Sequence, residues 1–188
     1  MPNGSFEEYS ECPLTNEIYN GQFERAIGWW PPTLGTPDYF HRCNNDLSGM
    51  VGVPNNFWGH QEAFHGEGYV GLVPMEVTNT GSFYGAEYIQ TRLNQPLKPC
   101  FEYYFSMHVS LTNYASHSLG RLGALFSVDT SFNSNANLDV ISRLPQVFYS
   151  SGQLSDTIDW MKIDGTFIAN GHEEFLTIGY FFEKITND

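Results

Sequence analysis

The segment from Tyr103 to Leu111, YYFSMHVSL, alternates apolar and polar side chains with a period of two. Successive side chains of a β-strand point to opposite faces of the sheet, so the alternation predicts a strand with one dry and one wet face. The expected core face carries Tyr103, Phe105, Met107 and Val109, and the expected solvent face carries Tyr104, Ser106, His108 and Ser110. A chain that contains such a strand must pair it with others.

Seven further segments have the same β character. Each is short, rich in Val, Ile, Tyr and Phe, and bounded by Gly, Pro, Asn or Ser. They are SGMVGV (48–53), GYVGLV (68–73), AEYIQTRL (86–93), ALFSV (124–128), QVFYS (146–150), DWMKIDGTFIA (159–169) and EFLTIGYFF (174–182). Strands at this spacing favour an all-β fold, a two-sheet antiparallel β-sandwich or a barrel, with residues 1–188 as a single domain.

Composition and charge exclude several classes of partner. The 8 basic and 21 acidic residues give a net charge of −13, which repels nucleic acid and anionic lipid. No apolar run approaches the roughly 20 residues of a membrane helix, so we expect no membrane insertion. Only 15% of the residues are charged, and a surface rich in Asn, Ser and Tyr is common outside cells. We expect an extracellular or cell-surface protein whose signal peptide is absent from this sequence.

The three cysteines allow one disulfide and leave one thiol. Cys12 and Cys43 lie in turn-rich segments, and a bridge between them would stabilise the fold by about 3 kcal/mol. We predict that bridge for an oxidising compartment; in a cytosolic protein both would remain thiols. Cys100, between Pro99 and an expected strand, is predicted to be a buried free thiol.

Aromatic residues in long, Gly- and Pro-rich connections are candidate sugar contacts. The segment GWWPPTLGTPDYFHRC (28–43) is too long for a hairpin and is expected to be a loop, and NNFWGHQEAFHGEGY (55–69) supplies further rings. A flat ring can stack on the apolar face of a pyranose. The candidate carbohydrate contacts are Trp30, Tyr39, His41, Trp58, His60 and Tyr84. The alternative is that such rings close one end of the fold, and we expect at least one of Trp29 and Trp30 in the core.

Signals for catalysis and for metal binding are weak. No GxSxG motif or phosphate-binding loop occurs, and acidic pairs such as Glu173 with Glu174 have no characteristic spacing. His60 and His65 are five residues apart, whereas one helix face needs four, so we do not predict a transition-metal site. Glu7 and Glu8 would point to opposite sides of a strand, so one carboxylate at most can join a calcium shell. We expect a protein without catalytic residues.

The chain resembles the N-terminal jelly-roll domain of secreted, surface-associated Bacteroidetes proteins, which is related to calcium-containing carbohydrate-binding modules of galactose-binding-like fold. The likeness lies in NGSFEEYSECP (3–13) with GWWPPTLGTPDYFHRC, in EAFHGEGYVGL (62–72), in YIQTRLNQPLKPCFEYYFSMHVSL (88–111), and in residues 144–182.

This resemblance implies a jelly roll whose first strand is NGSFEE, a structural Ca²⁺ held by Glu7 or Glu8, and export to the cell surface. The chain departs from the family at its end, where a closing strand with paired aspartates is expected after TIGYFF; without that strand a sheet edge is left open. Cys100 also departs, since relatives have a small turn residue there.

Three functions are compatible with these patterns. The leading prediction is an extracellular, non-catalytic module that binds a polysaccharide or glycan through loop aromatics. The alternative is a structural or adhesive module of a surface or filament assembly, which contacts other copies or surface proteins through an open sheet edge. The third is a small polysaccharide hydrolase or lyase, which would need two acidic groups or a His and a Tyr converging in a cleft.

Overall fold

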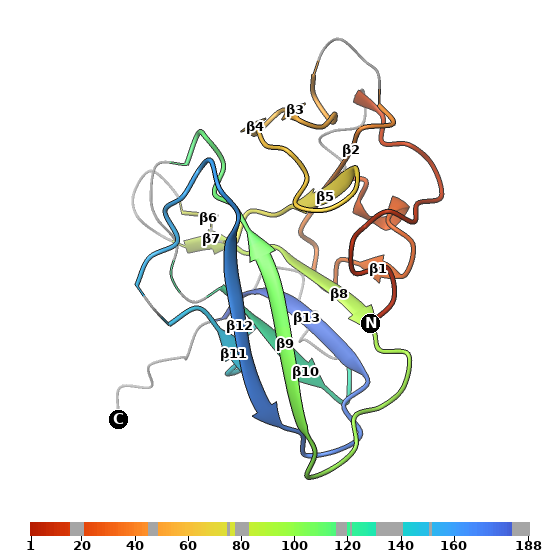
Figure 1. The fold of residues 1–188 in the computed structure, drawn as a ribbon, viewed down its shortest axis with the longest axis vertical. Helices are drawn as coiled ribbons and strands as arrows, with labels where there is room; N and C mark the ends of the chain where they lie inside the picture. Colours follow the sequence, from red (N-terminus) through yellow and green to blue (C-terminus); the bar gives the residue numbers. More distant parts are fainter. Residues whose placement is uncertain are drawn as a thin grey trace.

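The computed structural model describes residues 1–15, 21–44, 49–74, 76–77, 83–115, 120, 122–130, 141–150 and 152–181. All of the sheets in these ranges are antiparallel, and the ranges contain no α-helix. The short 3₁₀-helix η2 spans Phe23–Arg25, and Thr15 also has 3₁₀ geometry. The predicted all-β, antiparallel class is therefore confirmed (Figure 1).

A five-stranded sheet forms the centre of the molecule. Its order is β1 (Trp29–Trp30), β8 (Tyr88–Arg92), β13 (Phe175–Tyr180), β10 (Leu122–Ser127) and β11 (Val147–Phe148). Strands β10 and β13 pair from Leu122 opposite Tyr180 to Ser127 opposite Phe175. Gly179 in β13 faces Tyr88, and a Cβ there would come within 2.2 Å of the Tyr88 ring, so this position requires glycine.

A two-stranded ribbon crosses in front of this sheet (Figure 1). It consists of β9 (Glu102–Val109) and β12 (Met161–Ile168), which pair along their whole length from Glu102 opposite Ile168 to Val109 opposite Met161. Phe105 is buried while Tyr104 and Ser106 are exposed, so the predicted alternation of β9 is confirmed.

The main core lies between ribbon and sheet. Phe105 and Phe167 from the ribbon pack on Phe126 of β10 with ring centroids 5.6 and 4.6 Å apart. Leu176 and Ile178 of β13 join the same cluster. A second cluster covers the opposite face of the sheet and contains Ala86, Tyr88, Leu125, Ile141 and Phe181. Because both faces are covered, every residue of β10 is buried.

Three smaller pairs complete the described structure. They are β2 (Asp38–His41) with β5 (Gly68–Gly71), β3 (Asn55–Asn56) with β4 (Gly59–His60), and β6 (Glu76–Val77) with β7 (Phe83–Gly85). Strands β1 and β2 lie inside the segment 28–43, which was expected to be a loop, so that expectation is wrong. The segment 48–53 was expected to be a strand; within its described part, residues 49–53, the recorded pairing is an isolated bridge between Val51 and Asn56.

The expected first strand, NGSFEE, is also absent. Residues 2–5 form a turn, and Asn3 and Phe6 adopt positive φ angles of 41° and 61°, which no β-strand accommodates. The Asn3 side chain donates hydrogen bonds to the carbonyls of Glu8 and Ile27 and accepts one from the Glu8 N–H. Asparagine offers the backbone local bonds that compete with a sheet ladder, which explains the turn.

Candidate functional site

Two of the predicted sugar contacts are core residues. Tyr39 and His41 lie in β2, and their side chains are 0% and 3% exposed. The Tyr39 hydroxyl donates to the carbonyl of Phe6 at 2.8 Å, and the Cys43 N–H donates to His41 Nδ1 at 3.0 Å. Burial raises the pKa of the Tyr39 phenol and lowers that of the His41 imidazole. Their prediction as ligand contacts is wrong because β2 is covered on both faces.

Trp29, Trp30 and Trp58 are partly or fully buried. Trp29 is buried in the main core, as expected for one of the adjacent pair. Trp30 is half-buried, and its indole N–H donates to Gln90 Oε1 at 3.1 Å. Trp58 is also half-buried and donates to Asp38 Oδ2 at 2.7 Å. Burial raises the pKa of Asp38 to about 7, although the Trp58 hydrogen bond opposes the shift.

His60 and Tyr84 complete the predicted set. His60 is exposed in β4, and its Nδ1 lies 2.9 Å from Asn55 Oδ1. Tyr84 belongs to β7, but its side chain lies outside the described residues. The five candidates whose side chains are described come from different elements: Trp30 from β1 of the five-stranded sheet, Tyr39 and His41 from the buried strand β2, and Trp58 and His60 from the β3–β4 hairpin.

The Glu7 carboxylate accepts hydrogen bonds from the backbone of a distant turn. Its Oε1 accepts the N–H groups of Glu67 and Gly68, both at 2.9 Å. A Cβ on Gly66 would lie 2.3 Å from the Glu7 carboxyl carbon, so the carboxylate packs directly against the backbone at Gly66. Glu8 is exposed. Across the described residues, no group of three or more His, Cys, Asp or Glu side chains is placed to hold a metal ion.

The predicted disulfide is confirmed. Cys12 and Cys43 are joined, with Cα atoms 6.0 Å apart. Cys100 is free but exposed rather than buried, because it occupies a turn after Pro99 with a φ of 63°. Its N–H and the Phe101 carbonyl both bond to Ala169, which makes Cys100 the extra residue of a bulge at the start of β9.

The solvent face of the ribbon carries an exposed aromatic and charged group. Tyr104 is 57% exposed, and its hydroxyl donates to Asp164 Oδ2 at 2.8 Å. Lys162 Nζ donates to the same hydroxyl at 2.6 Å and to Asp164 at 3.1 Å. The Tyr104 hydrogen bond, followed by that of Lys162, lowers the pKa of Asp164 and keeps it ionised. Tyr104, Lys162 and Asp164 together present one aromatic ring, a hydroxyl, an ammonium and a carboxylate to solvent.

A second exposed ring lies at the other end of this face. Phe64, 55% exposed, stacks on His108 of β9 with centroids 3.6 Å apart and planes 13° from parallel. Trp160 packs edge-on against Phe64 at 6.3 Å, and its N–H donates to the Glu62 carbonyl at 2.8 Å. Tyr104 and His108 are four residues apart on one strand, or about 13 Å. We name Tyr104, Lys162, Asp164, Phe64, His108 and Trp160 the ribbon platform.

The alternation of residues 103–111 predicted the exposure of Tyr104 and Ser106. Phe64 fell among the loop rings of residues 55–69 and Trp160 in an expected strand, but no pattern indicated that they meet, because they reach the ribbon only through the path of the chain before β5 and before β12.

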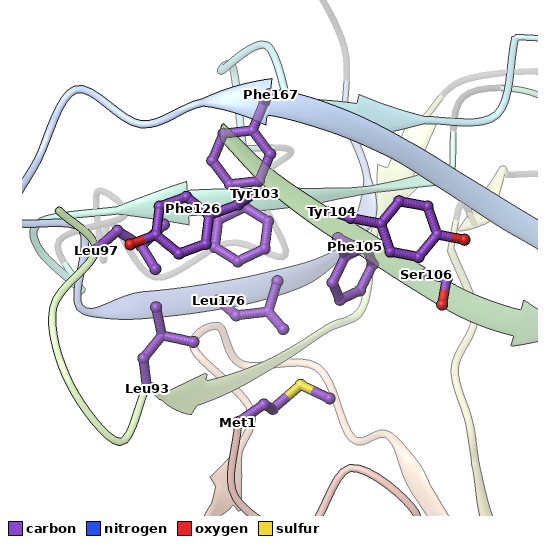
Figure 2. A pocket seen from close by; sticks show the side chains of 10 residues that line it. All are labelled: Met1, Leu93, Leu97, Tyr103, Tyr104, Phe105, Ser106, Phe126, Phe167 and Leu176. Atoms are coloured by element: carbon purple, nitrogen blue, oxygen red, sulfur yellow. The ribbon is translucent and has the colours of Figure 1, made fainter. Parts of the chain in front are cut away.

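A cavity of about 300 Å³ opens beside β9 (Figure 2). One wall is the run Tyr103–Ser106, and the opposite wall contains Leu93 and Leu97, which follow β8. Figure 2 shows Phe105 directed towards Leu176 and Tyr104 on the other side of the strand. Met1 also lines the cavity.

Comparison of the chain with protein-family models, with curated proteins and with solved structures finds no match. The resemblance to a Bacteroidetes jelly-roll domain therefore stays a prediction. No helix among the described residues is long and apolar enough to cross a membrane.

Proposed function

We propose that this protein is an extracellular, non-catalytic module that binds carbohydrate on the ribbon platform. The observation that carries the proposal is the exposure of Tyr104 and Phe64 on one face, each more than half exposed, beside the charged pair Lys162 and Asp164. Exposed rings on a flat β-face offer stacking area to sugars, and the adjacent polar groups offer hydrogen bonds to hydroxyls.

The platform has the extent needed for more than one sugar ring. Two aromatic positions separated by about 13 Å along β9 suit an extended oligosaccharide, with Ser106 and Asp164 between them. Lys162 donates to the Tyr104 hydroxyl and to Asp164, so these side chains are ordered before a ligand arrives. Preorganised groups lose less conformational entropy on binding.

Two further observations support the extracellular location and the jelly-roll fold that we propose. The Cys12–Cys43 disulfide is consistent with an oxidising, extracellular compartment. The packing of the β9–β12 ribbon over one face of the five-stranded sheet is compatible with a two-sheet sandwich of the jelly-roll type.

The test is affinity electrophoresis in gels that contain a panel of neutral and charged polysaccharides, followed by calorimetry with the matching oligosaccharide. Tyr104→Ala and Phe64→Ala are each expected to weaken binding about two- to twelvefold, since one stacked ring contributes on the order of 0.5 to 1.5 kcal/mol. Tyr114→Ala is the matched control, because Tyr114 is 73% exposed in a loop outside the platform. Equal losses in all three variants, or no retardation of the folded wild type by any polysaccharide, would refute the proposal.

A second candidate function is a structural or adhesive module that pairs with other proteins. The observation that favours it is that β9, among the described strands, pairs with β12 alone and so has one edge without a partner strand.

A further inference from the structure

One edge of β9 carries backbone groups without a partner strand. The Ala169 N–H donates to the Phe101 carbonyl at 3.0 Å, which makes Phe101 and Ala169 a hydrogen-bonded pair. In an antiparallel ladder such pairs alternate, so Tyr103, Phe105 and Met107 bond to β12. The N–H and C=O groups of Tyr104 and Ser106 consequently point away from β12. Within the described part of the chain, no hydrogen bond satisfies them.

The cavity beside β9 lies against this edge. It is lined by Tyr103, Tyr104, Phe105 and Ser106, four consecutive residues whose side chains alternate between the two faces of the strand. A cavity that touches all four is adjacent to the backbone rather than to either face. The free N–H and C=O groups therefore face the cavity.

The other surfaces of the cavity are apolar. Leu93 and Leu97 form the far wall, and Phe126 and Leu176 lie towards the main core (Figure 2). A sugar would place its hydroxyls against this apolar wall without hydrogen-bond partners, and a purely apolar ligand would leave the backbone groups of β9 unpaired. A polypeptide strand provides both kinds of contact, because its backbone pairs with β9 while alternate side chains enter the groove.

We propose that this groove binds an extended, basic or neutral segment of a partner protein, which adds as a third strand to the ribbon beside β9. The charge of the chain selects this partner over a second copy, because two chains of net charge −13 repel each other. Glu102, exposed at the start of the free edge, favours a basic residue at the facing position.

This proposal is independent of the carbohydrate proposal. Sugar binding depends on the rings of Tyr104 and Phe64, with the Ser106 side chain between them, whereas strand addition depends on the Ser106 backbone and on the leucine wall. Leu97→Gln separates the two proposals, because Leu97 lies in the groove and outside the ribbon platform.

The experiment begins with selection of random 12-residue linear peptides against the purified protein. The enriched peptides are expected to alternate apolar residues and to carry net positive charge. The tightest is then synthesised with a fluorophore and titrated by fluorescence polarisation. Ser106→Pro removes an N–H that points into the groove but takes no part in the β9–β12 ladder, so it is expected to weaken peptide binding at least tenfold.

Thr166→Pro is the matched control. Thr166 pairs with Tyr104 and, by the same alternation, directs its N–H to the opposite edge of the ribbon, away from the groove. Its peptide affinity is expected to equal that of the wild type. If Ser106→Pro fails to fold, Leu97→Gln tests the apolar wall and is expected to weaken binding at least fivefold.

Several outcomes would overturn the proposal. They are failure to enrich any peptide, enrichment without alternation, and equal binding by the wild type and the folded Ser106→Pro or Leu97→Gln variant. A concentration-dependent dimer in sedimentation velocity that Ser106→Pro abolishes would show that the occupant is a second copy instead.

Discussion

Residues 1–74 and residues 83–181 are stabilised in different ways. In the first region the strands span two to four residues, and single polar side chains bind the backbone. Gln22, for example, bonds both the N–H and the C=O of Leu14. In the second region β9 pairs with β12 over eight residue pairs, and β10 with β13 over six, around an apolar core.

The difference predicts where each region is sensitive to mutation. A short strand has few ladder bonds, so the first region depends on particular carboxylates, amides and the disulfide. A long ladder distributes its hydrogen bonds, so the second region depends on buried apolar volume and leaves its solvent face free to vary. Both proposed binding surfaces use β9. Among the described strands, β9 has one face exposed to solvent and one edge without a partner strand.

The largest expected effect is loss of apolar volume in the second region. Leu176→Ala removes a 0% exposed side chain from the main core and is expected to lower the free energy of unfolding by about 4 kcal/mol. Ile168→Ala on the ribbon, 68% exposed, is the matched control and is expected to change it by less than about 0.5 kcal/mol. Urea unfolding measures both. Equal changes in the free energy of unfolding for the two variants would contradict the assignment of Leu176 to the core and of Ile168 to the surface.

Removal of the disulfide is expected to have the next largest effect. Cys12→Ser combined with Cys43→Ser opens a loop between residues 31 apart in sequence and is expected to lower the free energy of unfolding by about 3 kcal/mol. Amide hydrogen exchange should quicken first in residues 1–44, while β9 and β12 retain protection up to the global limit. Uniform loss of protection would contradict the separation into two regions.

The Asp38 carboxyl makes the stability of the first region depend on pH. Burial raises the pKa of its carboxyl from 3.8 to about 7, so the folded state favours the neutral acid. Between these values the folded chain binds more protons than the unfolded chain, and stability from this group falls as the pH rises. Asp38→Asn keeps an acceptor for Trp58 and is expected to be more stable than the wild type by roughly 2 to 4 kcal/mol at pH 8, with little gain at pH 4. Parallel stability curves for the two proteins would contradict this.

The smallest expected effect concerns Glu7. Glu7→Gln weakens the acceptor for the Glu67 and Gly68 N–H groups and is expected to cost about 1 kcal/mol, whereas Glu8→Gln, at an exposed neighbour, is expected to be neutral. Thermal unfolding with calcium and with a chelator tests the metal prediction. A chelator-induced fall in Tm that Glu7→Gln abolishes would mean that Glu7 binds an ion as well as the turn.

Much of the second region was predictable from sequence. The strict alternation of residues 103–109 identified both faces of β9, and the Ile, Tyr and Phe content of 174–182 identified β13. Strand β2 was missed because Pro and Gly around Tyr39 and His41 are typical of a loop. The same context made two core residues resemble ligand contacts, since burial depends on the strands and loops that fold over a segment.

The sequence by itself determined that the described residues form an all-β structure and which residues of β9 face the core, and it predicted the Cys12–Cys43 bridge for an oxidising compartment. These properties depend on local alternation and on the chemistry of a few residues. Only the tertiary structure decided that Phe64 and Trp160 meet His108, that Glu7 caps a turn 60 residues away, and that a groove follows the free edge of β9. The physical reason is that contacts between distant segments arise from packing two sheet faces together, and no local periodicity encodes which loops then meet.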